Sequence, residues 1–161
     1  MAATTPAATG ARHTDERRTR HADMRSPDAL LAPAPVLVGS LTVAGRTKNV
    51  AEARAFVAKT LGVRHPCADV AVLLCSELVT NAVLHSDSGE PGGTVTVVVL
   101  NLSGAVRVEV IDNGSASRTP VVKSEVYVPD GHGLFLVEQL ADTWGYNRDE
   151  VGTTVWFRLT C

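Results

Sequence analysis

The apolar residues of the chain follow a helical pattern in two places and an alternating pattern in the second half. The longest apolar segment, from Val70 to about Ser86, has apolar side chains on nearly every side, as is typical of a helix buried in a core. Pro66 is expected in its first turn, and Asp69 is well placed for the positive end of its dipole. The rest of the chain is predicted to pack around this helix.

Two polar residues interrupt the central helix. Glu77 and Asn81 are four residues apart, so they share one face, among apolar neighbours. A carboxylate in such a place costs roughly several kcal/mol unless it is paired. Either nearby backbone or hydroxyl groups satisfy Glu77, or the pair belongs to a chemical site.

A strand and a shorter helix come before the central helix. Residues 36–43 read as a strand, and Thr47 is expected to cap a helix that runs to about Leu61. Gly62 is expected to end that helix. Its buried stripe is formed by apolar residues at helical spacing: Val50, Ala53, Phe56, Val57 and Leu61.

Two strands after the central helix are predicted to pair as a hairpin. Residues 94–100 and 105–111 are joined at 101–104, a connection of hairpin length and composition. The second strand alternates between Val106, Val108 and Val110, which are expected to face inward, and Arg107 and Glu109, which are expected to face outward. The same parity places Asp112 inward at the end of the strand.

The segment 115–130 shows no periodicity, and a loop of this length in a compact domain is often a functional lid. Residues 143–147 and 153–159 then read as two strands around a turn.

A glycine-rich junction separates this loop from a helix that reaches about Ala141. Gly131 and Gly133 open the helix, and glycines there allow phosphate to approach bare backbone N–H groups. A helix capped by Asp130 is the simpler interpretation.

The length, composition and net charge of the chain limit these interpretations. The 161 residues suggest one folded domain, 36–161, after a disordered tail, 1–35, that is rich in Ala, Thr, Pro and Arg. The net charge of -2 gives no reason to expect nucleic acid or an anionic membrane as partner, and no apolar run approaches the roughly 20 residues of a membrane span. Cys67, Cys75 and Cys161 are interpreted as small hydrophobes in a reducing cytoplasm.

In their order along the chain, these motifs resemble those of the Bergerat ATP-binding fold of the GHKL superfamily. Within it, residues 36–161 are most similar to the bacterial anti-sigma-factor serine/threonine kinases. The matching positions are Glu77 and Asn81 of the N box, Asp112 and Gly114 of the first glycine box, Gly131 and Gly133 of the second, and the last motif, 152–154. The resemblance implies an α+β two-layer sandwich, in which helices cover one face of a mixed, mostly antiparallel sheet.

The resemblance also implies roles for these residues. Glu77 would be the general base, and Asn81 would bind Mg²⁺ that bridges the phosphates of ATP. Asp112 would accept a hydrogen bond from the adenine amino group. The other nucleotide-binding positions would be Gly114, Gly131, Gly133, Leu134 and one of the neighbouring threonines, Thr153 or Thr154, between which the sequence does not choose.

Two positions depart from the family pattern. Ala116 stands where a second glycine is usual, which bears on lid mobility. His132 stands where an arginine is frequent, which bears on one phosphate contact.

Three functions are compatible with this pattern. The first is a cytoplasmic kinase that phosphorylates a serine of an antagonist protein and sequesters a sigma factor, either as a monomer or as a homodimer. The second is a nucleotide-dependent module that binds a partner without phosphorylating it. The third, the catalytic part of a sensor histidine kinase, needs a phosphoacceptor on a helical hairpin, and the proline-broken tail with His13 and His21 does not supply one. Other ATPases of the superfamily carry a further domain, for which the chain is too short.

Overall fold

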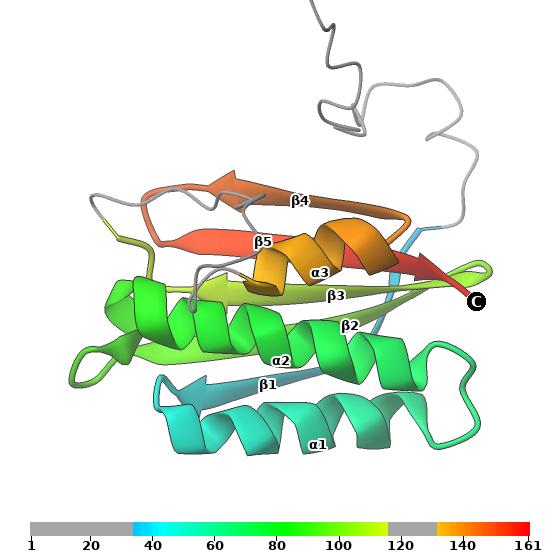
Figure 1. Cartoon of the computed structure of the whole chain (residues 1–161), viewed down its shortest axis with the longest axis horizontal. Helices are drawn as coiled ribbons and strands as arrows, with labels where there is room; N and C mark the ends of the chain where they lie inside the picture. Colours follow the sequence, from blue (N-terminus) through cyan, green and yellow to red (C-terminus); the bar gives the residue numbers. More distant parts are fainter. Residues whose placement is uncertain (1–33, 116–131) are drawn as a thin grey trace, which may run out of the picture.

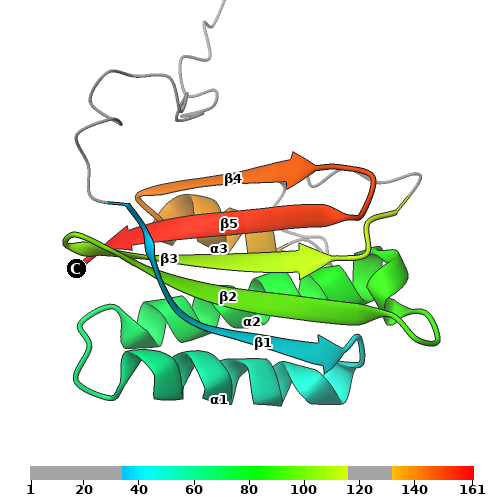
Figure 2. The same cartoon turned by 180° about the vertical axis from the view of Figure 1, so that it is seen from behind.

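The structure, a computed structural model, describes residues 34–115 and 132–161. Three helices cover one face of a five-stranded sheet (Figure 1), and no described helix lies on the other face (Figure 2). The predicted α+β two-layer sandwich is confirmed. The elements in chain order are β1 (Val36–Ala44), η2 (Thr47–Asn49), α1 (Val50–Leu61), α2 (Ala68–His85), η3 (Asp87–Gly89), β2 (Thr94–Leu102), β3 (Ala105–Asp112), α3 (His132–Leu140), β4 (Thr143–Arg148) and β5 (Thr153–Thr160).

The strands of the sheet lie in the order β1-β2-β3-β5-β4. Each of the four pairings is antiparallel, so the described sheet is uniformly antiparallel rather than mixed. The predicted hairpin is confirmed between β2 and β3, where Leu102 pairs with Ala105. Gly104 takes a φ of 74° in this turn, in the left-handed region that glycine adopts without strain.

The helix α1 packs with its predicted stripe against the core. Ala53 and Val57 are fully buried, and Val50, Phe56 and Leu61 are partly buried against the same core. Thr47 is not the helix cap: it lies in η2, and the N-cap residue of α1 is Asn49, whose side chain makes no capping hydrogen bond. The chain forms one 3₁₀ turn before the α-helix, which moves the helix start two residues further on.

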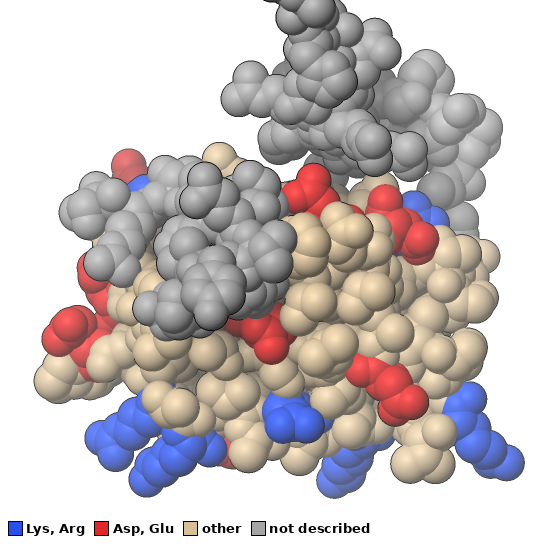
Figure 3. Space-filling model, in the orientation of Figure 1, with Lys and Arg blue, Asp and Glu red and all other residues tan. Residues whose placement is uncertain are grey.

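Exposed basic side chains line the edge of the molecule formed by α1. Figure 3 shows Lys and Arg along the lower edge, where α1 lies in Figure 1. The exposed basic residues of α1 and its flanks are Arg46, Lys48, Arg54, Lys59 and Arg64.

The central helix α2 is buried on one side only. Leu73 is 42% exposed and Leu84 is 53% exposed, so the prediction of a helix buried all round is wrong. The helix contacts α1, α3 and the sheet, and no described element covers its outer surface. Pro66 lies two residues before Ala68, the first helical residue, and therefore outside the first turn. Of the described helices, α2 alone is long and apolar enough to cross a membrane, and it contributes seven buried residues to the core.

The core between the two layers is built mainly from valine. The inward residues of β2 and β3 are Val95, Val97, Val99, Val106, Val108 and Val110, as the alternation predicts for β3. On the helix-free face, Arg107 forms an ion pair with Glu109 at 2.8 Å and lies over the Trp156 ring, 4.1 Å from its centroid. The predicted outward direction of Arg107 and Glu109 is therefore confirmed.

The cysteines differ from the prediction. Cys67 and Cys161 form a disulfide, with Cα atoms 5.7 Å apart across a sequence separation of 94. Cys75 is unpaired and buried, and burial raises its pKa to about 12. The interpretation as a small buried hydrophobe is thus right for Cys75 and wrong for the other two, because only the fold brings the start of α2 to the end of β5.

Candidate functional site

Four segments that are far apart in the sequence meet around the second half of α2 and the ends of β3 and β5. The N–H of Asp87, just after α2, donates to the carbonyl of Gly114 beyond β3 at 2.7 Å. Asp112, at the end of β3, pairs with Thr153, at the start of β5. The first turn of α3 approaches α2 at Gly133.

The α2–α3 approach involves both polar residues of the central helix. A β-carbon at Gly133 would lie 2.5 Å from Asn81 Nδ2 and 3.2 Å from Glu77 Cβ. Both polar residues are half-buried, and Gly133 itself is buried. The absence of a side chain at Gly133 is therefore what allows α3 to begin directly against this pair. The fold thus brings Gly133 against Glu77 and Asn81.

Asp112 is half-buried on the inner side of the sheet, as its parity predicts. Its carboxylate accepts a hydrogen bond from the Gly114 N–H at 2.6 Å. Burial raises the pKa of this carboxyl above its usual range, against the opposing effects of the Gly114 and Thr153 backbone N–H groups and the Arg148 guanidinium. The site thus holds an acid that is partly desolvated and fixed in place by the backbone.

The backbones of the two strand ends approach closely beside Asp112. Gly114 has a φ of 71°, and a β-carbon on it would lie 3.2 Å from the Cα of Gly152. A β-carbon at Gly152 would lie 1.8 Å from the carbonyl oxygen of Asp112. These two glycines therefore allow β3 and β5 to meet at this point, and the space beside the carboxylate stays free of their side chains.

The two candidate threonines lie on opposite faces of the sheet. Thr153 pairs with Asp112 and is 3% exposed, on the same face as the buried Val155. Thr154 pairs with Ile111 and is half-buried on the helix-free face. Of the two, Thr153 shares the face of Asp112.

A buried serine that the sequence did not single out organises this end of the sheet. Ser88 is fully buried; its hydroxyl donates to the Thr94 carbonyl at 2.7 Å and accepts from the Asn113 N–H at 2.8 Å. The Asn113 side-chain oxygen accepts from the Thr94 N–H, also at 2.8 Å. These bonds fix the end of β3, and with it Asp112, relative to the end of α2. Because Ser88 lies in a polar, glycine-rich turn, no periodicity marks it as buried.

Arg148, at the end of β4, is a second residue that sequence reasoning missed. It donates to the carbonyl of Ser115, and its charge acts on Asp112. The pairing of β4 with β5 brings it there, since Arg148 lies across from Thr153.

A family described as histidine kinase-like ATPase domain matches residues 43–159, more than half of the chain. The chain belongs to this family. No curated protein matches the sequence of this chain.

A solved structure shares the fold of this histidine kinase-like ATPase domain. It is the crystal structure of the RsbU and RsbW domains of Rv1364c from Mycobacterium tuberculosis, with 23% sequence identity and a TM-score of 0.51. The likeness covers 76% of this chain and 32% of that crystallised chain, so this protein corresponds to about a third of the chain in that structure. The expected Bergerat fold is confirmed by the family and by this likeness.

The residues present fit the nucleotide that membership in an ATPase-domain family implies. At positions 114, 133 and 152, glycine lets backbone rather than a side chain approach Asp112 and Asn81, as a phosphate- and base-binding cradle requires. An amide oxygen on Asn81 is a ligand that suits Mg²⁺.

Several predicted positions take no part in the geometry described above. Gly131, Asp130, Ala116 and the predicted lid after Ser115 lie outside the described residues, as does the tail before Ala34. Leu134 is 8% exposed, and its side chain packs in the core.

Proposed function

We propose that the chain is an ATP-binding regulatory serine/threonine kinase of the anti-sigma-factor type. It transfers the γ-phosphate of ATP to a serine of an antagonist protein and sequesters a sigma factor. The observation that supports this most is the contact of Gly133 with Glu77 and Asn81. This contact supports the proposal because a helix N-terminus, which suits phosphate, then lies beside a carboxylate and an amide, and an amide oxygen is a ligand type that suits Mg²⁺.

In this proposal Asp112 recognises the base. Its carboxylate accepts a hydrogen bond from the adenine amino group, and Thr153, on the same face, is the threonine that assists it. Gly114 lets the backbone pass close to the base, and its N–H keeps the carboxylate oriented.

Asn81 would hold Mg²⁺ through its side-chain oxygen, and the ion would neutralise charge on the phosphates. Glu77, one turn earlier on α2, would take the proton from the incoming serine hydroxyl. Gly131 and Gly133 would present backbone N–H groups to the phosphates.

The partners and the compartment follow from the motif resemblance. We infer a sigma factor and a small antagonist protein as partners, with no direct contact to nucleic acid or membrane, and a cytoplasmic location.

The test is phosphate transfer from labelled ATP to a candidate antagonist, with and without Mg²⁺. Label on an antagonist serine, abolished by chelation of Mg²⁺, supports the kinase. Nucleotide-dependent partner binding without transfer would instead identify the binding module of the same fold. A folded chain that shows neither activity contradicts both.

Asp112→Asn is expected to weaken adenine-nucleotide binding by about 1–3 kcal/mol, because a charged acceptor is replaced by a neutral one. In the wild type the affinity should also fall as the pH drops through the raised pKa of Asp112, since the protonated carboxyl is a poorer acceptor. Isothermal titration calorimetry against pH measures both effects. A pH dependence that persists in Asp112→Asn would assign it to another group.

The same carboxyl affects stability in a defined direction. Because its pKa is raised on folding, the folded state binds this proton more tightly than the unfolded state. Its contribution to stability is therefore fully present below the ordinary pKa of an aspartate and is lost as the pH rises through the raised value. Urea unfolding of the wild type and Asp112→Asn across this range should show the difference.

Gly133→Ala is expected to weaken Mg²⁺-dependent nucleotide binding and to lower stability only slightly, because the β-carbon also lies close to Glu77 Cβ. The new β-carbon displaces the Asn81 amide, which is the mobile end of a side chain, while alanine favours the helix by up to about 1 kcal/mol. Calorimetry and thermal unfolding separate the two effects. Gly145→Ala is the control: its β-carbon would lie 2.9 Å from Trp156 Cζ2, so it should lower stability without changing affinity.

A further inference from the structure

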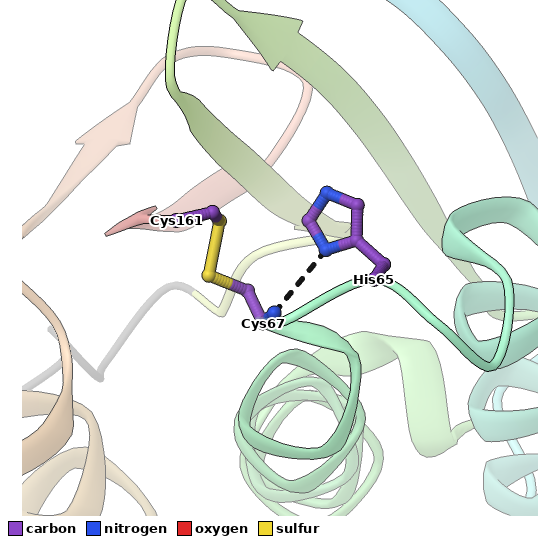
Figure 4. A group of neighbouring side chains, drawn as sticks. All are labelled: His65, Cys67 and Cys161. Atoms are coloured by element: carbon purple, nitrogen blue, oxygen red, sulfur yellow. Dashed lines mark hydrogen bonds between the residues drawn. A yellow bond between two sulfur atoms is a disulfide. The ribbon is translucent and has the colours of Figure 1, made fainter.

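Three side chains of metal-ligating type gather at the end of α2 opposite to the nucleotide site. They are His65, Cys67 and Cys161, and their donor atoms lie within 4.8 Å of one another (Figure 4). Cys67 precedes α2 and Asn81 lies 14 positions further on, about 20 Å along the helix. The cluster is therefore separate from the residues assigned to nucleotide.

The backbone holds the imidazole in a form that can bind a metal. The N–H of Cys67 donates to His65 Nδ1 at 3.2 Å, so Nδ1 carries a lone pair. The N–H of Ala68 donates to the His65 carbonyl at 3.0 Å, which fixes the backbone of this connection. Nδ1 is thus an acceptor, as coordination requires, and a bound metal would take the place of its hydrogen bond.

The surroundings of the two sulfur atoms favour a cation between them. Cys67 Sγ lies 3.4 Å from the Thr160 carbonyl oxygen, and Cys161 Sγ lies 3.4 Å from the Leu159 carbonyl oxygen. Cys67 is also the N-cap residue of α2, where the helix dipole favours a thiolate. On the other side, the N–H of Cys161 donates to the Gly104 carbonyl at 3.0 Å and holds its backbone.

We propose that, when the disulfide is reduced, His65 Nδ1 and the two thiolates bind one Zn²⁺, with the fourth position left to solvent. Tetrahedral zinc bonds to sulfur and nitrogen place the donor atoms roughly 3.5–3.8 Å apart. That spacing fits within the 4.8 Å that encloses the three donor atoms. Two soft thiolates and an imidazole select zinc over the oxygen-preferring Mg²⁺.

Metal and disulfide exclude each other at this site. A dithiol reductant passes two electrons and two protons to the disulfide and itself becomes a disulfide, which leaves two thiols. Each thiol then releases one proton to solvent as its Zn–S bond forms. In the reverse direction a two-electron oxidant such as diamide takes one electron pair and is reduced to a hydrazine, with two protons from solvent. The sulfur atoms rejoin, and Zn²⁺ is released.

The test is metal titration of the reduced full-length protein under argon. Co²⁺ should bind with one-to-one stoichiometry and give the thiolate charge-transfer and visible bands of a tetrahedral site, and Zn²⁺ should displace it. Diamide should release one Zn²⁺ per chain to a chromophoric chelator. His65→Ala should weaken Zn²⁺ binding at least about tenfold, as is seen even for residues that only support a metal ligand.

The variants distinguish this site from other thiols. Cys161→Ser should lose the charge-transfer band, while Cys75→Ala, which removes the buried thiol, should keep it. Circular dichroism confirms that each variant is folded. No binding to the folded, reduced wild type overturns the proposal, as does binding that is equal in Cys161→Ser or in His65→Ala. Since no step uses ATP, the result is independent of the proposed kinase activity.

Discussion

Glu77→Gln is expected to lower the rate of phosphate transfer by about 10²–10⁴-fold while nucleotide affinity changes little. Glutamine keeps the size of the side chain and most of its hydrogen bonding but cannot take a proton from the serine hydroxyl. Single-turnover transfer from labelled ATP measures the rate, and calorimetry measures the affinity.

Glu77→Gln has a matched comparison and one outcome that contradicts its role as the base. Asn81→Ala is the matched comparison, because loss of the metal ligand should reduce binding and transfer together. If the wild type transfers phosphate and Glu77→Gln does so equally fast, Glu77 is a structural residue on the face that packs against Gly133, and the base lies elsewhere.

Cys161→Ser is expected to lower the free energy of unfolding by about 2–4 kcal/mol under oxidising conditions, or the melting temperature by roughly 5–15 °C. The disulfide joins residues 94 apart in sequence, so it restricts the unfolded chain strongly. Urea unfolding with a chelator present, which keeps metal from the thiols, measures this change.

The reduced wild type is the control for this substitution. With a dithiol reductant and a chelator, wild type and Cys161→Ser should have the same stability within error. If they already agree without reductant, Cys67 and Cys161 are not bonded in solution. If they still differ with it, the substituted serine side chain disturbs the packing of the strand end directly.

The sequence by itself determined most of the helices and strands and supplied the candidate residues for the chemistry. Local periodicity predicts α1, the β2–β3 hairpin and the inward direction of Asp112, because these depend on which neighbours along one segment share a face. The positions of Glu77 and Asn81 on one helical face follow from the same rule. The order of the motifs was enough to indicate the histidine kinase-like ATPase family, because the spacing of motifs along the sequence does not depend on how the elements pack.

The tertiary structure decided what depends on distant partners. Leu73 and Leu84 are exposed because, among the described elements of this two-layer fold, none covers the outer side of α2. Ser88 became a buried hydrogen-bonding residue only when Thr94 and Asn113 came to it, and Thr153 was separated from Thr154 only by the pairing of β3 with β5.

The cysteines show the same limit of sequence-based prediction for residues that are far apart in the chain. Nothing within either segment relates Cys67 to Cys161, because their contact arises when the end of β5 passes the start of α2. Helical and strand periodicity depends only on neighbours along the chain. A disulfide or a metal site depends on distances between distant segments, which are set only when the helices pack on the sheet.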